Sequence, residues 1–144
     1  MGLIDSIIGA ESGGNPNATN PNSSASGAGQ FINSTWLDTL AKHRPDLTGS
    51  PEELLALRND PKLSAEMTAA YAGDNQAILA KAGLPVTPGS TYLAHFAGPG
   101  GAVSVLNADP ATPVAQILPS AMKANPFLQG MTAGDLRAWA DRKT

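Results

Sequence analysis

Five prolines in this chain directly follow a Ser, Thr or Asp, and four of these pairs, taken as helix starts, constrain the fold more than any other feature. The four pairs are Ser50-Pro51, Asp60-Pro61, Thr87-Pro88 and Thr112-Pro113. A hydroxyl or carboxylate side chain caps the first turn of a helix, and proline suits the first helical position because no partner is needed there for an amide. No run of alternating β-branched residues competes with these helix starts. The sequence therefore predicts an all-α fold.

Apolar spacing adds further helices to those that begin at the prolines. Leu3, Ile4, Ile7, Ile8 and Glu11 fall along one side of a first helix, which Gly13-Gly14 ends. A second helix is expected to carry Phe31, Ile32, Trp36, Leu37 and Leu40. The helix that begins at Pro61 should be the longest, run to about Ala82, and use Leu63, Met67, Ala70, Tyr71, Ile78 and Leu79 on its apolar face. Gly98-Pro99 should interrupt the helix that follows Thr87, and residues 132–135 resemble a capping box.

The length of 144 residues, 42% of them hydrophobic, suits one domain with its own core. We therefore expect six to eight helices in a single domain over residues 1–144, with a helical C-terminal part over 101–144. The chain is expected to be a monomer.

Charge and composition exclude several classes of function. The net charge is −3 and no Lys or Arg precedes Lys42, so the basic stripe of a nucleic-acid binder is missing. The absence of Cys excludes disulfide scaffolds, thiolate zinc sites and Cys nucleophiles. The two histidines, His43 and His95, form no helical pair, so we expect no metal site, and no cofactor is implied.

No apolar stretch reaches the length of a membrane span, so no span is expected. The first eight residues have no basic region and include Asp5 in their apolar run, which is not the pattern of a signal peptide. If the protein acts outside the cytoplasm, we expect it to be a domain of a longer protein, a mature form, or a phage protein released at lysis.

Residues 12–30 form an unusually polar loop, in which 15 of 19 positions are Gly, Ser, Thr, Asn or Pro. Structureless loops of this length are uncommon in ordered domains unless they have a function. Neutral amide and hydroxyl groups of this kind suit the recognition of sugars. The alternative is a flexible polar loop without a ligand.

Glu11 is the strongest candidate for chemistry. It lies one turn after Ile7 and Ile8 on the apolar side of the first helix, and at the helix C-terminus, where the dipole disfavours negative charge. Burial and the dipole should both raise the pKa of its carboxyl group, as general-acid catalysis of glycosidic cleavage requires. The alternative is an exposed Glu that only water solvates.

Three short motifs in the chain resemble sequence elements of a single known family. Glu11-Ser12-Gly13-Gly14-Asn15-Pro16 resembles the Glu-Ser-x-x-Asn-Pro signature of the lytic transglycosylase domain (SLT-type, goose-lysozyme-like). Residues 27–35, Gly-Ala-Gly-Gln-Phe-Ile-Asn-Ser-Thr, are similar to its Gly-Leu-Met-Gln-x-x-Pro-x-Thr element, and residues 94–100, Ala-His-Phe-Ala-Gly-Pro-Gly, to its Ala-Tyr-Asn-Ala-Gly-Pro-Gly element. The motifs follow the family's order and span residues 11–100.

The resemblance implies a lysozyme-like helical fold and cleavage of the bond between N-acetylmuramic acid and N-acetylglucosamine in peptidoglycan glycan strands. Glu11 would protonate the glycosidic oxygen and then accept the proton of the C6 hydroxyl as a 1,6-anhydro ring closes. No second carboxylate is needed, because the substrate supplies its own N-acetyl and C6 hydroxyl groups.

The resemblance also implies a set of substrate-binding residues. Gln30 matches the family's groove glutamine, and Asn20 stands where many members have a Ser; the full set is Asn20, Ser26, Gln30, Phe31, His95 and Phe96. Two departures are visible: Gly29 replaces a Met, and His95-Phe96 replaces Tyr-Asn. Phe31, Tyr71, Tyr92 and Phe96 could instead be core residues, and Trp36 and Trp139 are expected to anchor the core.

Two alternatives stay open. The first is lysozyme-type hydrolysis of the same bond, for which Asp5 or Asp74 could position a water molecule. The second is a peptidoglycan-binding module without catalysis, which the departures at Gly29, His95 and Phe96 favour. The resemblance implies a location in the periplasm or cell wall, or a phage-encoded protein that is released at lysis.

Overall fold

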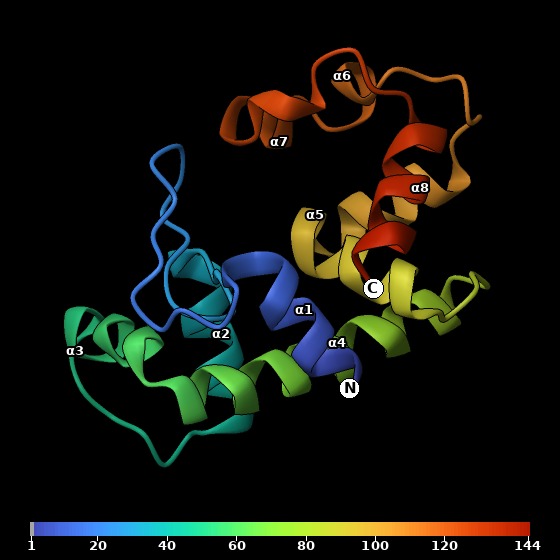
Figure 1. Ribbon diagram of the computed structural model, residues 1–144. Helices are drawn as coiled ribbons and strands as arrows, with labels where there is room; N and C mark the ends of the chain where they lie inside the picture. Colours follow the sequence, from blue (N-terminus) through green and yellow to red (C-terminus); the bar gives the residue numbers. More distant parts are fainter. Residues whose placement is uncertain (1) are drawn as a thin grey trace. The chain divides into compact units, whose positions relative to one another are not determined.

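The computed structural model describes residues 2–144 and is mostly helical (Figure 1). Helices make up 66% of it, with eight α-helices and no strands among the described residues, which confirms the expected all-α fold. The α-helices are α1 (Leu3–Ser12), α2 (Asn33–His43), α3 (Pro51–Ala56), α4 (Pro61–Lys81), α5 (Pro88–Asn107), α6 (Val114–Ile117), α7 (Pro119–Ala124) and α8 (Ala133–Lys143), and two 3₁₀ helices are η1 (Leu57–Asn59) and η2 (Pro126–Leu128).

The chain divides into two compact units, the first up to Tyr71 and the second Ala72–Thr144. Each has its own buried side chains and is described by itself below. Whether the units fold as the single domain expected from the length stays a prediction. No helix among residues 2–144 combines the length and apolarity that crossing a membrane requires.

Reciprocal side-chain caps fix three of the helix starts. At α3 the Ser50 hydroxyl accepts from the Glu53 amide, and the Glu53 carboxylate accepts from the Ser50 amide, both at 3.2 Å. Thr87 forms the same arrangement at α5, and Thr132 at α8. The boxes expected at residues 50–53 and 132–135 are therefore confirmed, because a hydroxyl three residues before an acceptor satisfies amides that a helix start leaves unpaired.

The core of the first unit is built around Trp36. Its side chain is 0% exposed, and Nε1 donates a hydrogen bond of 2.8 Å to the carbonyl of Leu54 in α3. The Phe31 ring meets the indole edge-on, with 5.2 Å between centroids. Aliphatic side chains of α2 and α4 complete the cluster with Leu40, Leu63 and Met67. Trp36 thus anchors the core, as expected.

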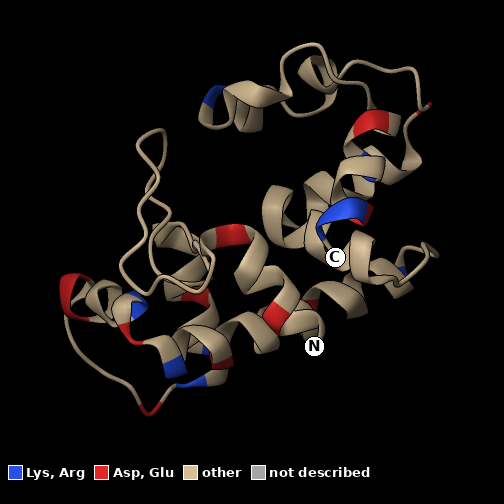
Figure 2. Cartoon of the chain, viewed as in Figure 1, with Lys and Arg blue, Asp and Glu red and all other residues tan. Residues whose placement is uncertain are grey.

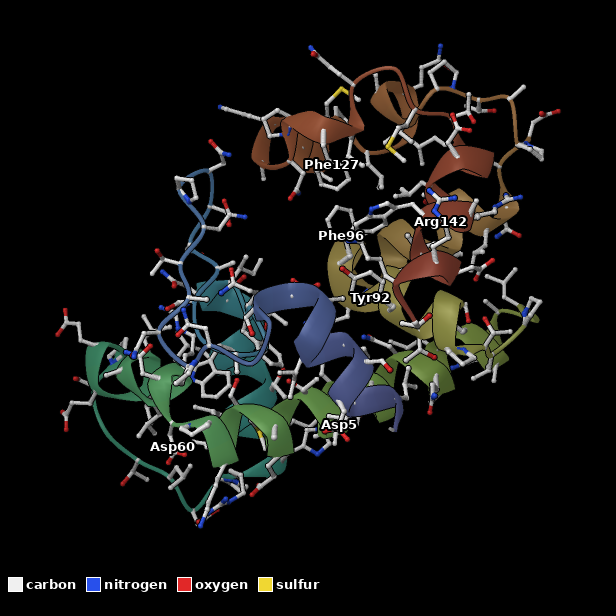
Figure 3. All side chains as sticks on the ribbon, in the orientation of Figure 1. Asp5, Asp60, Tyr92, Phe96, Phe127 and Arg142 are labelled. Carbon is white, nitrogen blue, oxygen red and sulfur yellow. The ribbon has the colours of Figure 1, made fainter. Side chains whose placement is uncertain are left out.

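In the second unit, α5 packs along α8. Aromatic rings line this contact: Tyr92 and Phe96 of α5 lie 5.5 and 5.0 Å from Trp139 of α8, measured between ring centroids. Figure 3 labels Tyr92 and Phe96 together with Phe127 of η2, whose ring completes the group and is 50% exposed. The helical path of α5 breaks at Gly98, with φ 79° and ψ 158°, at the expected interruption.

Two expectations at the level of single elements were wrong, and one helix was not anticipated. Phe31 and Ile32 precede α2 instead of belonging to it, because Ile32 has the extended backbone of an N-cap. Ile78 is 43% exposed while its neighbour Leu79 is fully buried; adjacent helical residues point about 100° apart, and here the buried face of α4 includes Leu79 and leaves Ile78 outside it. The short helix α7 was not anticipated, because its apolar residues are too few to show a period.

Replacing Trp36 by Phe should lower the free energy of unfolding by about 2 kcal/mol, because the change opens a cavity and leaves the partly buried Leu54 carbonyl without its donor. Urea unfolding followed by circular dichroism measures the loss. Ile78→Val, at an exposed position, should stay within about 0.5 kcal/mol of wild type. Equal losses in the two variants would contradict the packing described.

Candidate active site

Glu11 lies in the last turn of α1. Its side chain is half-buried, and the carboxyl oxygen Oε1 is inaccessible to solvent. Ile7, one turn earlier, is fully buried, so this side of α1 faces the core as the apolar spacing predicted. The helix ends at Gly13, which has a left-handed backbone (φ 64°) and donates its amide to the Gly9 carbonyl at 2.9 Å. The carboxyl group is thus held at the C-terminal end of a helix whose stop is well defined.

Ser12, the residue after Glu11, ties this helix end to the loop. Its hydroxyl donates to the carbonyl of Ala28 at 2.6 Å, across 16 residues of sequence. The same oxygen accepts the amide of Gly14 at 3.1 Å. One short side chain therefore connects the turn that carries Glu11 to the second motif.

Local side-chain hydrogen bonds order the outer part of the loop. Asn15 and Asn20 accept the amides two residues after them, at 3.0 and 2.8 Å, and Ser23 accepts that of Ala25 at 3.1 Å. The loop leaves α1 as a long excursion (Figure 1), and it carries no charged side chain (Figure 2). Turns of this kind give the backbone partners that no helix or sheet supplies here.

Ser26 is where the loop closes on itself. It forms isolated bridges with Thr19 on one side and Phe31 on the other. Asn20 and Ser26, two of the candidate binding residues in this loop, are both half-buried and keep part of their surface exposed. Phe31 is only 2% exposed and packs on Trp36, which favours the core role over contact with a sugar.

Gln30 has the left-handed backbone that non-glycine residues seldom adopt, with φ 51°. Its side-chain nitrogen Nε2 donates to the carbonyls of Ala18 (3.0 Å) and Gly27 (2.8 Å). The amide that the resemblance implies for substrate binding therefore also holds both sides of the loop together. Unusual backbone conformations that the surroundings hold in place concentrate at functional sites.

Gly29 is required by a close approach to α4. A Cβ atom at this position would lie 2.5 Å from Oγ1 of Thr68 and 3.0 Å from the Phe31 ring. The Gly29 amide donates to the buried hydroxyl of Ser64 at 3.1 Å. The departure from the family's Met therefore has a local cause, because α4 occupies the space that a larger side chain would need.

The third motif lies in the second unit, on α5. His95 and Phe96 are both half-buried and precede the break at Gly98. The Phe96 ring packs against both Trp139 and Phe127, with centroids at 5.0 and 6.0 Å. Phe96 thus has a packing role in its own unit and keeps part of its surface exposed.

Sequence reasoning missed two residues. Phe127 has no motif around it, and only the structure shows that it joins the aromatic group of α5 and α8. Arg58 of η1 donates to backbone carbonyls of the loop, and carbonyl acceptors leave no pattern in a sequence. Among residues 2–144 no group of three or more His, Asp or Glu side chains could hold a metal ion.

Adding the same methyl group at two glycines should have opposite effects. Gly29→Ala should lower the free energy of unfolding by about 1–3 kcal/mol, because the Cβ has no room beside Thr68. Gly9→Ala, in α1 with open space around it, should raise it by about 0.5–1 kcal/mol. Thermal and urea unfolding of both variants test this contrast. A stabilising Gly29→Ala would refute the close approach.

The resemblance to lytic transglycosylases rests on three short motifs in the chain. Its three motifs lie at the end of α1, in the loop before α2, and around the break in α5. No protein-family model matches the chain.

Proposed function

We propose that this protein is a peptidoglycan lytic transglycosylase in which Glu11 acts as general acid and then as general base. The observation that carries the proposal is the setting of Glu11: a half-buried carboxyl group at the C-terminal end of α1, beside an ordered and uncharged loop. Burial and the negative end of the helix dipole both disfavour the charged carboxylate, and a general acid must hold its proton until the transition state.

The reaction proposed needs only one carboxyl group and no added water. Glu11 gives its proton to the glycosidic oxygen as the bond from that oxygen to C1 of N-acetylmuramic acid breaks. The C6 hydroxyl of the same sugar then bonds to C1, and its proton passes to the Glu11 carboxylate. The products are a new N-acetylglucosamine end and a 1,6-anhydro end, and Glu11 is again protonated.

The loop suits the substrate side of this proposal. Its exposed groups are the neutral amides and hydroxyls of Asn, Ser and Thr, which donate and accept hydrogen bonds as sugars do. Its turns are satisfied internally, so little further ordering is needed when a ligand binds. Asn20, Ser26 and Gln30 are the proposed contacts in the first unit, and a role of His95 and Phe96 in binding stays a prediction from the resemblance.

Hydrolysis of the same bond would need a group that positions water, and Asp5 is poorly placed for it. Asp5 is exposed and six residues before Glu11 on the same helix. That separation is about 9 Å along the axis and about 120° around it. The two carboxylates therefore point to different sides of α1. Asp74 lies on α4 in the second unit.

Glu11→Gln should lower the release of soluble fragments from purified peptidoglycan by about a hundredfold or more, because the amide keeps the shape but has no proton to give. The matched control is Asp38→Asn, which makes the same change at an exposed position of α2 and should leave the rate unchanged. Mass spectrometry of the fragments gives the rate. Full activity in a folded Glu11→Gln variant would rule out the proposal.

The wild-type products separate the alternatives in the same experiment. Muropeptides lighter by one water than their hydrolytic counterparts are expected. Reducing-end muropeptides, with a lower rate in Asp5→Asn or in a matching Asp74→Asn variant, would instead establish hydrolysis. Binding to insoluble peptidoglycan without any soluble fragment would indicate a module that binds but does not cleave.

A further inference from the structure

Arg58 is a cation whose acceptors are all backbone carbonyls. Its Nη1 donates to the carbonyls of Ser24 at 2.8 Å and Phe31 at 2.9 Å, and Nε donates to that of Leu55 at 3.1 Å. Ser24 and Phe31 are the two ends of one segment of the loop, residues 24–31. A single guanidinium nitrogen therefore closes this segment, because the two hydrogens of Nη1 reach both carbonyls, while Nε anchors the group to Leu55.

No carboxylate among the described residues pairs with Arg58. Partial burial without such a partner lowers the pKa of the guanidinium. Arg44, in the same unit, is the opposite case: it bonds Asp46 and Glu66 at about 3.0 Å, and these carboxylates raise its pKa. No ion pair offsets the burial of Arg58. Its contribution to the structure is therefore the three hydrogen bonds that it donates to backbone carbonyls.

The backbone of Arg58 also contacts the same segment. A Cβ atom at Gly27 would lie 2.1 Å from the Arg58 carbonyl oxygen, so the two main chains are in direct contact there. Within the segment, the Ser26 amide donates to the Phe31 carbonyl at 3.2 Å. The Phe31 carbonyl thus receives both the strand-like bond and the guanidinium, which fixes the position of the turn between them.

This segment is also the part of the loop that contacts α1. The Ala28 carbonyl accepts the hydroxyl of Ser12, the residue that follows Glu11. A shift of residues 24–31 would therefore reach the last turn of α1 through one short hydrogen bond. The chain of contacts runs from Arg58 through the segment to Ser12, entirely within the first unit.

We propose that Arg58 is a positioning residue, whose guanidinium holds residues 24–31 against the end of α1 and so sets the sugar-binding loop relative to Glu11. The proposal rests on the proposed function for its effect on catalysis. Its effect on the loop does not depend on that function. The two can therefore be measured separately.

The test compares Arg58→Gln with Arg58→Lys, and uses Arg44→Gln as the matched control. Arg58→Gln should exchange the amides of Ser26, Gly27 and Gln30 with deuterium about tenfold faster or more, since each depends on the closed segment. Amides of α2 and α4 should exchange as in wild type. Arg58→Lys, which keeps the charge but not the fork, should restore part of the protection.

Cleavage of peptidoglycan is measured well below the unfolding temperature of each variant. Fragment release should fall about tenfold or more in Arg58→Gln, recover in part in Arg58→Lys, and stay unchanged in Arg44→Gln. A residue with a merely structural role would instead speed exchange throughout the unit and leave the rate of the folded protein unchanged. That pattern, or wild-type exchange in the loop, would overturn the proposal.

Two further outcomes are informative. If Arg58→Gln does not fold, the lysine variant decides: protection and activity both at wild-type level would overturn the proposal, and a loss of both confined to the loop supports it. If wild-type protein releases no fragments, the proposed function fails, while the exchange of residues 24–31 still shows whether Arg58 holds them.

Discussion

Buried backbone amides and carbonyls need partners, and a long loop without helix or sheet must find them one at a time. The loop after α1 meets this constraint with Asn and Ser side chains at its outer turns and with four further side chains at its base. Ser12, Gln30, Arg58 and Ser64 each bond a backbone group of the loop. These bonds connect the base of the loop to α1, η1 and α4.

Much of the helical architecture could be predicted because helix starts depend on local chemistry. Ser50 with Glu53 and Thr132 with Asp135 form the reciprocal caps that their spacing indicates. Burial was harder to predict. Ile78 fits an apolar spacing but lies outside, since the direction of a helix face is set by what packs on it and not by its own sequence.

The candidate site divides in the same way. Glu11 could be singled out from periodicity, because Ile7 and the glycine stop define both the face and the end of α1. The requirement for glycine at position 29 could not be predicted, because it comes from Thr68, 39 positions away on another helix. Arg58 was equally hidden, since its role depends on carbonyl groups that every residue possesses.

The absence of charge from residues 12–30 has a consequence for how any ligand would be held there. At physiological ionic strength, dissolved ions largely screen the attraction between exposed charges that lie more than about 8 Å apart. They have little effect on hydrogen bonds between neutral groups. The affinity of this loop for a neutral ligand should therefore change little between low and high salt concentrations. A protein that works on material outside a cell, where the salt concentration is not regulated, would gain from such insensitivity.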